Sequence, residues 1–411
     1  MNLILIDIKK DKNSIAIIEE DRLVEFYIEE ENEKILGNIY RGKVVNVLPG
    51  MEAAFVDIGE KKNAYLYIKD ALPKLVDYKE DVSIKDIVKV GDDLIVQVIK
   101  EAIGTKGPKI TTHITIPSRY IVLTPYSNKI SISRKIEDEN EIKRLLNIGG
   151  NIKKDDIGMI FRTASQGVES IKLEEELKFL LDLYSKIERE KNFSPSPKLI
   201  YKEIDILNRI IRDIFINFKG KLIINNKEKY KDILNLVQYI NPESHKNIEL
   251  KDGKDIFKSH NIYDEIEKAL NRKVPLKSGG YLIIDETEAL TAVDINTGKY
   301  IGSLDLESTA LETNLEAVEE LTRQLRLRNI GGIIIIDFIA MNNQDDEELI
   351  MEKLEEELKK DRTKTSVVGM TKLGLVEMTR KKVRNRLSWG YFKTCPHCNG
   401  SGKILLNNID K

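Results

Sequence analysis

Short apolar runs separated by polar turns characterise the first 112 residues. Runs at 3–6, 14–18 and 23–28 predict an antiparallel meander, which is too small to be stable alone and must pack on a later segment. Between residues 36 and 112 the apolar runs become shorter and are separated by glycine turns. This pattern predicts a small β-barrel.

After residue 112 the sequence predicts helices as well as strands. Strand-like runs continue from residue 113 to about 166, and a charged helix is predicted over 173–191. Two prolines in the segment 192–197 end that helix. Helices and strands then alternate, which predicts α/β organisation. The predicted elements are helices at 204–216, 230–239 and 262–270 and a strand at 222–224.

Two aspartates follow apolar strands in the second half. A hairpin over 281–284 and 289–293 leads into Asp294 and Asn296, and the run 331–336 leads into Asp337. A carboxylate beside an apolar strand is costly unless something binds it, and ligands gather at the carboxyl ends of such strands. A lone aspartate would be read as a turn cap. For the pair, with a helix over 309–329 as a possible crossover, we favour a magnesium site.

Composition narrows the class of protein. Charged residues make up 33% and hydrophobic ones 41%, the net charge is −2, and no apolar run reaches membrane-spanning length. No signal peptide is expected, so we predict a cytoplasmic protein. The four histidines lack the spacing of a zinc hydrolase, and no phosphate-binding loop, nucleophile elbow or EF-hand is found. Any catalysis must therefore depend on carboxylates.

Both cysteines lie in one short segment. Cys395 and Cys398 are followed by Gly400 and Gly402, the turn residues of a zinc knuckle. Zinc prefers four ligands, and the segment supplies two thiolates. The pair is either incidental or half of a site that a second chain completes. We favour the shared site, which predicts a zinc-linked homodimer.

The barrel carries aromatic and basic residues. The order of its elements resembles an S1 domain, an OB-fold that binds single-stranded RNA. Phe55 and Tyr65 would then stack on bases, and Lys100 and Lys106 would follow the phosphates. Aromatic residues in a barrel are often core residues, but the S1 pattern favours surface stacking.

Basic residues recur at three further places. Arg162 and Thr163 end an apolar strand, where they could contact a phosphate, although surface arginines are usually only solvated. Basic runs at 323–328 and 380–386 lie on either side of Asp337 in the sequence and so flank the predicted metal site. Such runs are normally solvated faces, but in this position they suggest a polyanionic ligand.

Together these motifs resemble the ribonuclease E/G family, and the shorter ribonuclease G branch in the detail of 374–381. The most specific matches are the segments around Asp294 and Asp337, the run 324–329 and the cysteine pair. The resemblance implies an α/β fold of several subdomains. These would be an RNase H-like subdomain (1–35 and 205–276), an inserted S1 domain (36–112) and 5′-sensor region (113–204), a DNase I-like catalytic subdomain (277–391), and a zinc link with tail (392–411).

The resemblance also implies an endoribonuclease of RNA processing and decay that cleaves single-stranded RNA to 5′-phosphate and 3′-hydroxyl ends. Asp294 and Asp337 would hold magnesium, and Asn296 would orient Asp294. A 5′-monophosphate pocket would be formed by Val122, Arg134, Arg162 and Thr163, and Cys395 and Cys398 would bind zinc. The alternatives to an endoribonuclease are a non-catalytic RNA-binding scaffold and a DNA nuclease.

Three features depart from the family pattern. Ala340 stands where relatives commonly carry a second acid, Ser118 replaces a glycine of the sensor, and Lys364 replaces an arginine and cannot make forked contacts. In addition, only residues 403–411 follow the knuckle of residues 395–402, so the family's small C-terminal domain is not expected, nor a tetramer built on it.

Overall fold

The N-terminal strands pair with strands from the second half of the chain. The computed structural model describes residues 1–402 except 10–11, 31–34, 72–81, 103–105, 154–156, 194, 204–205, 299–305, 342, 399 and 401. The chain forms two units: Met1–Glu31 with Ile214–Lys411, and Asn32–Asp213. We call them the discontinuous unit and the inserted unit.

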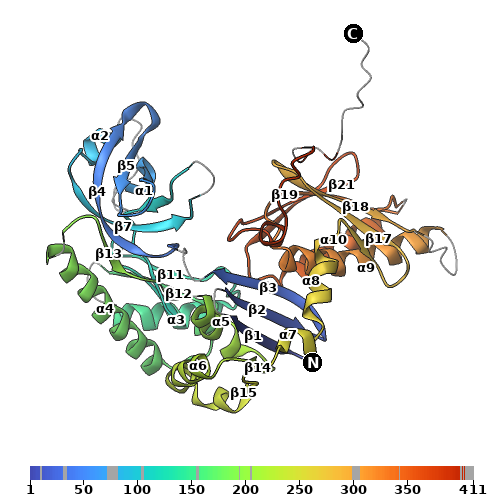
Figure 1. Cartoon of the computed structure of the whole chain (residues 1–411), viewed down its shortest axis with the longest axis horizontal. Helices are drawn as coiled ribbons and strands as arrows, with labels where there is room; N and C mark the ends of the chain where they lie inside the picture. Colours follow the sequence, from blue (N-terminus) through green and yellow to red (C-terminus); the bar gives the residue numbers. More distant parts are fainter. Residues whose placement is uncertain are drawn as a thin grey trace, which may run out of the picture. The chain divides into compact units, whose positions relative to one another are not determined.

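The first sheet of the discontinuous unit has the order β15-β14-β1-β2-β3. The predicted meander forms its antiparallel half, and Leu3 lies in parallel register with Lys221. The strands are β1 (Leu3–Lys9), β2 (Lys12–Glu19), β3 (Arg22–Glu30), β14 (Lys221–Ile224) and β15 (Ile248–Leu250). The helices that accompany them are α6 (Lys227–Ile240), α7 (Ile256–Ser259) and α8 (Ile262–Leu270) (Figure 1). The sheet thus joins both ranges assigned to the split subdomain, whose relation to RNase H stays a prediction.

The second sheet of this unit has the order β16-β17-β18-β19-β21-β20. Its strands are β16 (Lys273–Pro275), β17 (Tyr281–Glu286), β18 (Leu290–Asn296), β19 (Gly332–Asp337), β20 (Thr365–Met370) and β21 (Leu375–Arg380). Strand β16 lies in the range assigned to the first subdomain but pairs with β17. Strands β18 and β19 are parallel, as a helical crossover requires.

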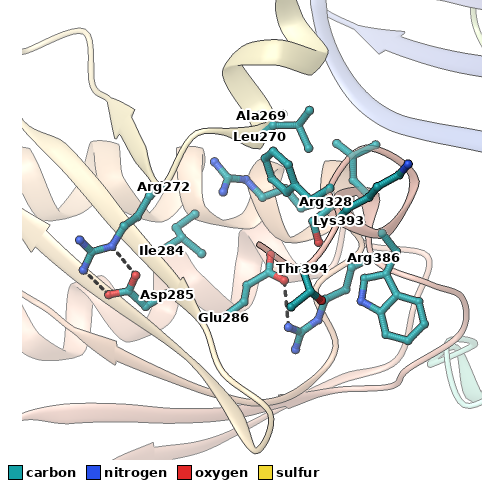
Figure 2. A pocket seen from close by; sticks show the side chains of 14 residues that line it. Ala269, Leu270, Arg272, Ile284, Asp285, Glu286, Arg328, Arg386, Lys393 and Thr394 are labelled. Atoms are coloured by element: carbon teal, nitrogen blue, oxygen red, sulfur yellow. Dashed lines mark hydrogen bonds and ion pairs between the residues drawn. The ribbon is translucent and has the colours of Figure 1, made fainter. Parts of the chain in front are cut away.

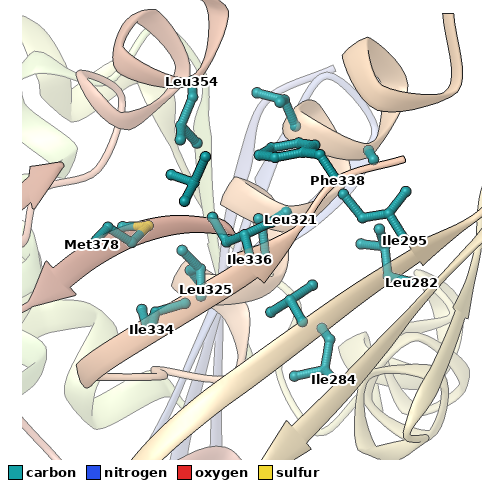
Figure 3. Close-up of a cluster of buried hydrophobic side chains, with 14 of the residues drawn as sticks. Leu282, Ile284, Ile295, Leu321, Leu325, Ile334, Ile336, Phe338, Leu354 and Met378 are labelled. Carbon is teal, nitrogen blue, oxygen red and sulfur yellow. The ribbon is translucent and has the colours of Figure 1, made fainter. Parts of the chain in front are cut away.

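That crossover contains α9 (Leu306–Leu327), and α10 (Gln344–Leu358) packs beside it. Figure 3 shows Leu321 and Leu325 of α9 beside Ile334 and Ile336 of β19, all fully buried in one apolar cluster. Truncation of such a leucine to alanine typically costs about 2–5 kcal/mol. One face of the sheet is therefore fixed by the core, which leaves alternate residues on the opposite face.

Arg323 and Arg326 of the basic run at 323–328 do not belong to the polyanion-binding surface that the sequence suggested, because ion pairs within the unit engage both. Arg326 is buried and donates to Glu25 at 2.9 Å and to Glu19 at 2.9 Å, on strands of the first sheet. Arg323 pairs with Glu320, and Arg328 is buried. In the second run Arg380 is buried against Asp361 and Arg386 pairs with Glu286. These arginines join parts of one unit.

The inserted unit contains a barrel-like sheet. Its order is β13-β4-β5-β6-β8-β7, and a further pairing of β4 with β7 closes it. The strands are β4 (Ile39–Leu48), β5 (Ala53–Asp57), β6 (Ala64–Tyr67), β7 (Asp93–Lys100), β8 (Lys109–Thr111) and β13 (Lys198–Tyr201), with short helices α1 (Ile68–Ala71) and α2 (Ile84–Ile87). The predicted barrel is therefore present, while its assignment as an S1 domain stays a prediction.

A four-stranded sheet completes the inserted unit in the order β11-β12-β10-β9. Its strands are β9 (Ile116–Pro117), β10 (Ile121–Thr124), β11 (Ile130–Ile132) and β12 (Gly158–Phe161), and its helices are α3 (Glu139–Ile152), α4 (Ser170–Phe193) and α5 (Ile206–Asp213). Helix α3 corrects the expectation of continuous β structure here.

Five 3₁₀ turns also occur in the described chain, at Pro49–Met51, Thr163–Ser165, Phe215–Asn217, Pro242–Asn247 and Leu387–Gly390. No helix of the described residues is long and apolar enough to span a membrane.

Candidate active site

Asp294 and Asp337 lie side by side on the open face of the second sheet. They are register partners on the parallel strands β18 and β19, whose spacing is about 5 Å. Because side chains alternate along a strand, burial of Val293 and Ile336 in the core directs both aspartates to the opposite face. Both are exposed. The structure therefore brings the two predicted carboxylates together.

Asn296 lies on the same face, two residues along β18. Its Nδ2 donates a hydrogen bond of 2.9 Å to Oδ2 of Asp294. The sequence had suggested that the strand ends before Asp294. It instead extends to Asn296, so Asp294 lies within β18. An amide that holds one carboxylate oxygen restricts the orientation of the other.

The donors at this site fit a magnesium ion. Within the described ranges, no three His, Cys, Asp or Glu side chains gather as a metal cage. Magnesium, however, is usually held by one or two carboxylates while water and substrate phosphates complete its octahedron. Asp294 and Asp337 supply that number of carboxylates. Ala340, exposed three residues after Asp337, adds no oxygen ligand from its side chain.

The predicted 5′-phosphate residues lie at one end of the four-stranded sheet. Val122 is register partner of Ile160 on the side away from the helices, and Arg162 follows two residues later. The Thr163 hydroxyl lies 2.9 Å from that of Ser133, next to the exposed Arg134. The four residues thus come from β10, the end of β12 and the turn after β11.

Arg162 has a partner that the sequence did not reveal. Its Nη1 donates to the Ser118 carbonyl at 2.6 Å and to Oδ1 of Asp213 at 2.7 Å. Arg212 also donates to both carboxylate oxygens of Asp213. Although burial acts in the opposite direction, the two guanidiniums hold the pKa of Asp213 below its usual range. Because the contact at position 118 uses the backbone, Ser118 provides it as a glycine would.

The predicted RNA-binding residues lie on the outside of the barrel. Phe55 and Tyr65 are half-buried register partners with ring centroids 6.0 Å apart, and Lys100 and Lys106 are exposed. The structure also places Lys109 here, as register partner of both Tyr65 and Lys100, and it pairs with Asp70 at 2.6 Å. The alternation of Tyr65 and Tyr67 could have indicated that this face is aromatic.

The remaining predicted residues are the two cysteines and Lys364. Cys395 is exposed and Cys398 half-buried, and neither forms a disulfide. The described residues bring no cluster of further zinc ligands to them. Lys364 is exposed just before β20, in the discontinuous unit.

Comparison with known proteins defines the class. The family model for the Ribonuclease E/G family matches residues 115–383. Ribonuclease G of Escherichia coli (strain K12) is 41% identical over 410 residues, which cover 98% of this chain and 84% of that protein. Ribonuclease G of Haemophilus influenzae is 40% identical with the same coverage. Ribonuclease E of Nostoc sp. is 34% identical over 95% of this chain and 57% of its own length.

The chain belongs to the ribonuclease E/G family. The family prediction is therefore confirmed, and so is the predicted class of enzyme. The two ribonuclease G relatives share more identity with the chain than the Nostoc ribonuclease E does.

Proposed function

We propose that this chain is a magnesium-dependent endoribonuclease that cleaves single-stranded RNA in RNA processing and decay. The observation that carries the proposal is the register of Asp294 with Asp337 on an open sheet face. Two adjacent exposed carboxylates with no basic side chain in ion-pairing distance among the described residues are suited to a cation and its phosphate ligand. A scaffold without catalysis would have no need of this arrangement.

The chain's own residues position the reaction. Asp294 and Asp337 hold the metal, and the Asn296 amide keeps Asp294 in one orientation. Magnesium, when bound, polarises the phosphodiester and lowers the pKa of a coordinated water. By family resemblance the products carry 5′-phosphate and 3′-hydroxyl ends.

The inserted unit contributes the RNA contacts in this proposal. Phe55 and Tyr65 offer ring faces on which bases of any sequence can stack, and Lys100 and Lys106 attract the backbone. At the other sheet, Arg162, Thr163 and Arg134 bind a 5′-monophosphate through charged hydrogen bonds. A 5′-hydroxyl leaves these donors without a phosphate, so monophosphorylated RNA is the preferred substrate.

The cysteine pair serves assembly in this proposal. Cys395 and Cys398 of two chains bind one zinc, so the purified protein should contain about half a zinc per chain and form dimers. Replacing both cysteines by serine should release the metal and weaken the dimer. One tightly bound zinc per monomeric chain would contradict the shared site.

Incubation with a 3′-labelled, A/U-rich RNA tests the catalytic proposal. We expect internal cleavage with Mg²⁺, none with EDTA, and faster cleavage when the 5′ end carries a monophosphate. DNA of the same sequence is the control for a DNA nuclease. RNA that binds but remains intact in Mg²⁺ would instead support the scaffold alternative.

A further inference from the structure

A second site lies in the discontinuous unit, and none of the residues proposed above for catalysis or RNA contacts lines it. It is a cavity of about 650 Å³ between the end of α8, the edge of the second sheet around β17, and the segment before the cysteines (Figure 2). Its volume lies in the range of small-molecule sites. Four basic and two acidic side chains line it, so its wall carries excess positive charge.

Ion pairs account for two of the basic residues. Arg272 pairs with Asp285 through two hydrogen bonds, and Arg386 pairs with Glu286 at 2.9 Å, as the dashed lines of Figure 2 show. The other two, Arg328 and Lys393, have no carboxylate within ion-pairing distance among the described residues. The positive charge available to a ligand therefore comes from these two side chains.

Arg328 has unusual surroundings for a cation. It is 5% exposed and donates to the Gln324 side chain at 2.6 Å and to the Asn271 carbonyl at 2.9 Å, both neutral acceptors. Burial lowers its pKa to about 10. The carboxylates of Glu286 and Glu320 act on this guanidinium only from beyond ion-pairing distance. A buried guanidinium without a directly paired carboxylate is costly, and an anion in the cavity would compensate it.

Aromatic rings form another part of the lining. Trp389 and Phe392 both line the cavity, yet their side chains are 61% and 60% exposed. Large aromatic rings left open beside basic groups are the arrangement that binds single-stranded nucleic acid, since a base can stack while its phosphate is neutralised.

We propose that this cavity binds one nucleotide unit of the RNA, with the base on Trp389 and Phe392 and the phosphate at Arg328 and Lys393. The proposal deepens the proposed function, because RNA is the ligand in both. The cavity also lies near the carboxylate of Asp294. Asp285, which lines the cavity, and Asp294 lie on the same face of neighbouring strands. Asp285 raises the pKa of Arg272, and the charge of Asp294 adds a smaller effect in the same direction. An RNA strand bound there would continue past the cleavage site.

The single tryptophan of the chain makes the proposal directly measurable. Because Trp389 is the only tryptophan, its fluorescence reports on this cavity alone. The 411-residue protein is titrated in EDTA, where no cleavage occurs. The ligands are an oligoadenylate of five nucleotides, AMP or adenosine, and the tryptophan is excited at a wavelength that adenine does not absorb. We expect saturable quenching by the oligomer and AMP, and binding of adenosine at least about tenfold weaker, since it lacks the phosphate.

Exposed positions provide variants that do not threaten the fold. Phe392→Ala should weaken oligomer binding at least about fivefold through lost stacking. Lys393→Gln should reduce the salt dependence of oligomer binding by about the amount that one phosphate contact contributes. Leu373→Ala and Lys359→Gln, exposed and outside the cavity, should change neither.

Three results would overturn the proposal. They are no saturable quenching, equal binding of adenosine and AMP, or binding unchanged in both cavity variants. Quenching by AMP but not by the oligomer would assign the cavity to free nucleotides and overturn the RNA assignment. Since the readout is binding without metal, it stands whether or not Asp294 and Asp337 prove catalytic.

Discussion

Two groups of acidic residues in the discontinuous unit have opposite surroundings. Glu25 is buried between Arg326 and Arg362, and these cations lower its pKa although burial alone would raise it. Asp294 and Asp337 are exposed, and Asp294 accepts a hydrogen bond from the neutral amide of Asn296. Acidic residues whose charge is already compensated hold the subdomains together. Those that remain open to a cation mark the candidate site.

The largest expected effect is on catalysis. Asp294→Asn or Asp337→Asn should reduce Mg²⁺-dependent RNA cleavage by about a hundred- to a thousandfold or more, because each removes a charge that holds the metal. Since both side chains are exposed, the midpoint of thermal unfolding and RNA binding should hardly change. Glu355→Gln, an exposed change on α10, is the matched control. Near-normal cleavage by either aspartate variant would refute the catalytic assignment.

The buried group should respond in the opposite way. Arg326→Met should lower the free energy of unfolding by about 3 kcal/mol, because Glu25 loses a buried partner. Arg362→Met, at a more exposed position, should cost about 1 kcal/mol or less. Urea denaturation measures both changes, and equal effects would mean that burial does not distinguish the two pairs.

The pH dependence sharpens this comparison. The lowered pKa of Glu25 stabilises the fold above its unfolded value near 4.5, and this contribution is lost as the pH falls through the folded pKa. The difference in unfolding free energy between the wild type and Arg326→Met should therefore shrink below pH 4.5. A constant difference down to pH 3 would show that lost packing, rather than charge, explains the variant.

The amide of the open site should have a smaller effect than its carboxylates. Asn296→Ala should slow cleavage by about 10- to 100-fold, as expected for a group that orients a metal ligand. Because both carboxylates remain, raising the Mg²⁺ concentration should recover part of the rate. Loss as complete as that in Asp294→Asn would mean that the amide has a direct role in the reaction.

The sequence predicted the open site because its cues are local. An apolar run followed by aspartate can be read within a few residues, and α9 indicated that the two strands are parallel. The end of β18 was placed too early, since Asp294 and Asn296 continue the alternation and pair with Ile283 and Tyr281 of β17. A polar residue on the open face of a strand resembles the start of a loop.

The buried group could not be predicted from local cues. Arg326 looks like part of a solvated run, because its partner Glu25 lies 301 residues away in the sequence. Helix α3 was missed because the strand-like runs around it suggested continuous β structure. Its Gly149 permits close packing, as a Cβ there would lie 2.9 Å from the Phe161 ring. Both features depend on tertiary contacts.

Arg162 is intermediate between the two groups, and its replacement should have the smallest effect. It is paired with Asp213, yet its side chain remains 30% exposed at the end of an open sheet face, where a phosphate can reach it. Arg162→Ala should leave the fold intact, because Arg212 still holds both oxygens of Asp213. It should remove most of the preference for 5′-monophosphorylated over 5′-hydroxyl RNA without lowering the rate on the latter. Arg189→Ala, exposed on α4, is the control. Equal rates on both substrates with the unmodified enzyme would show that Arg162 serves only its structural pair with Asp213.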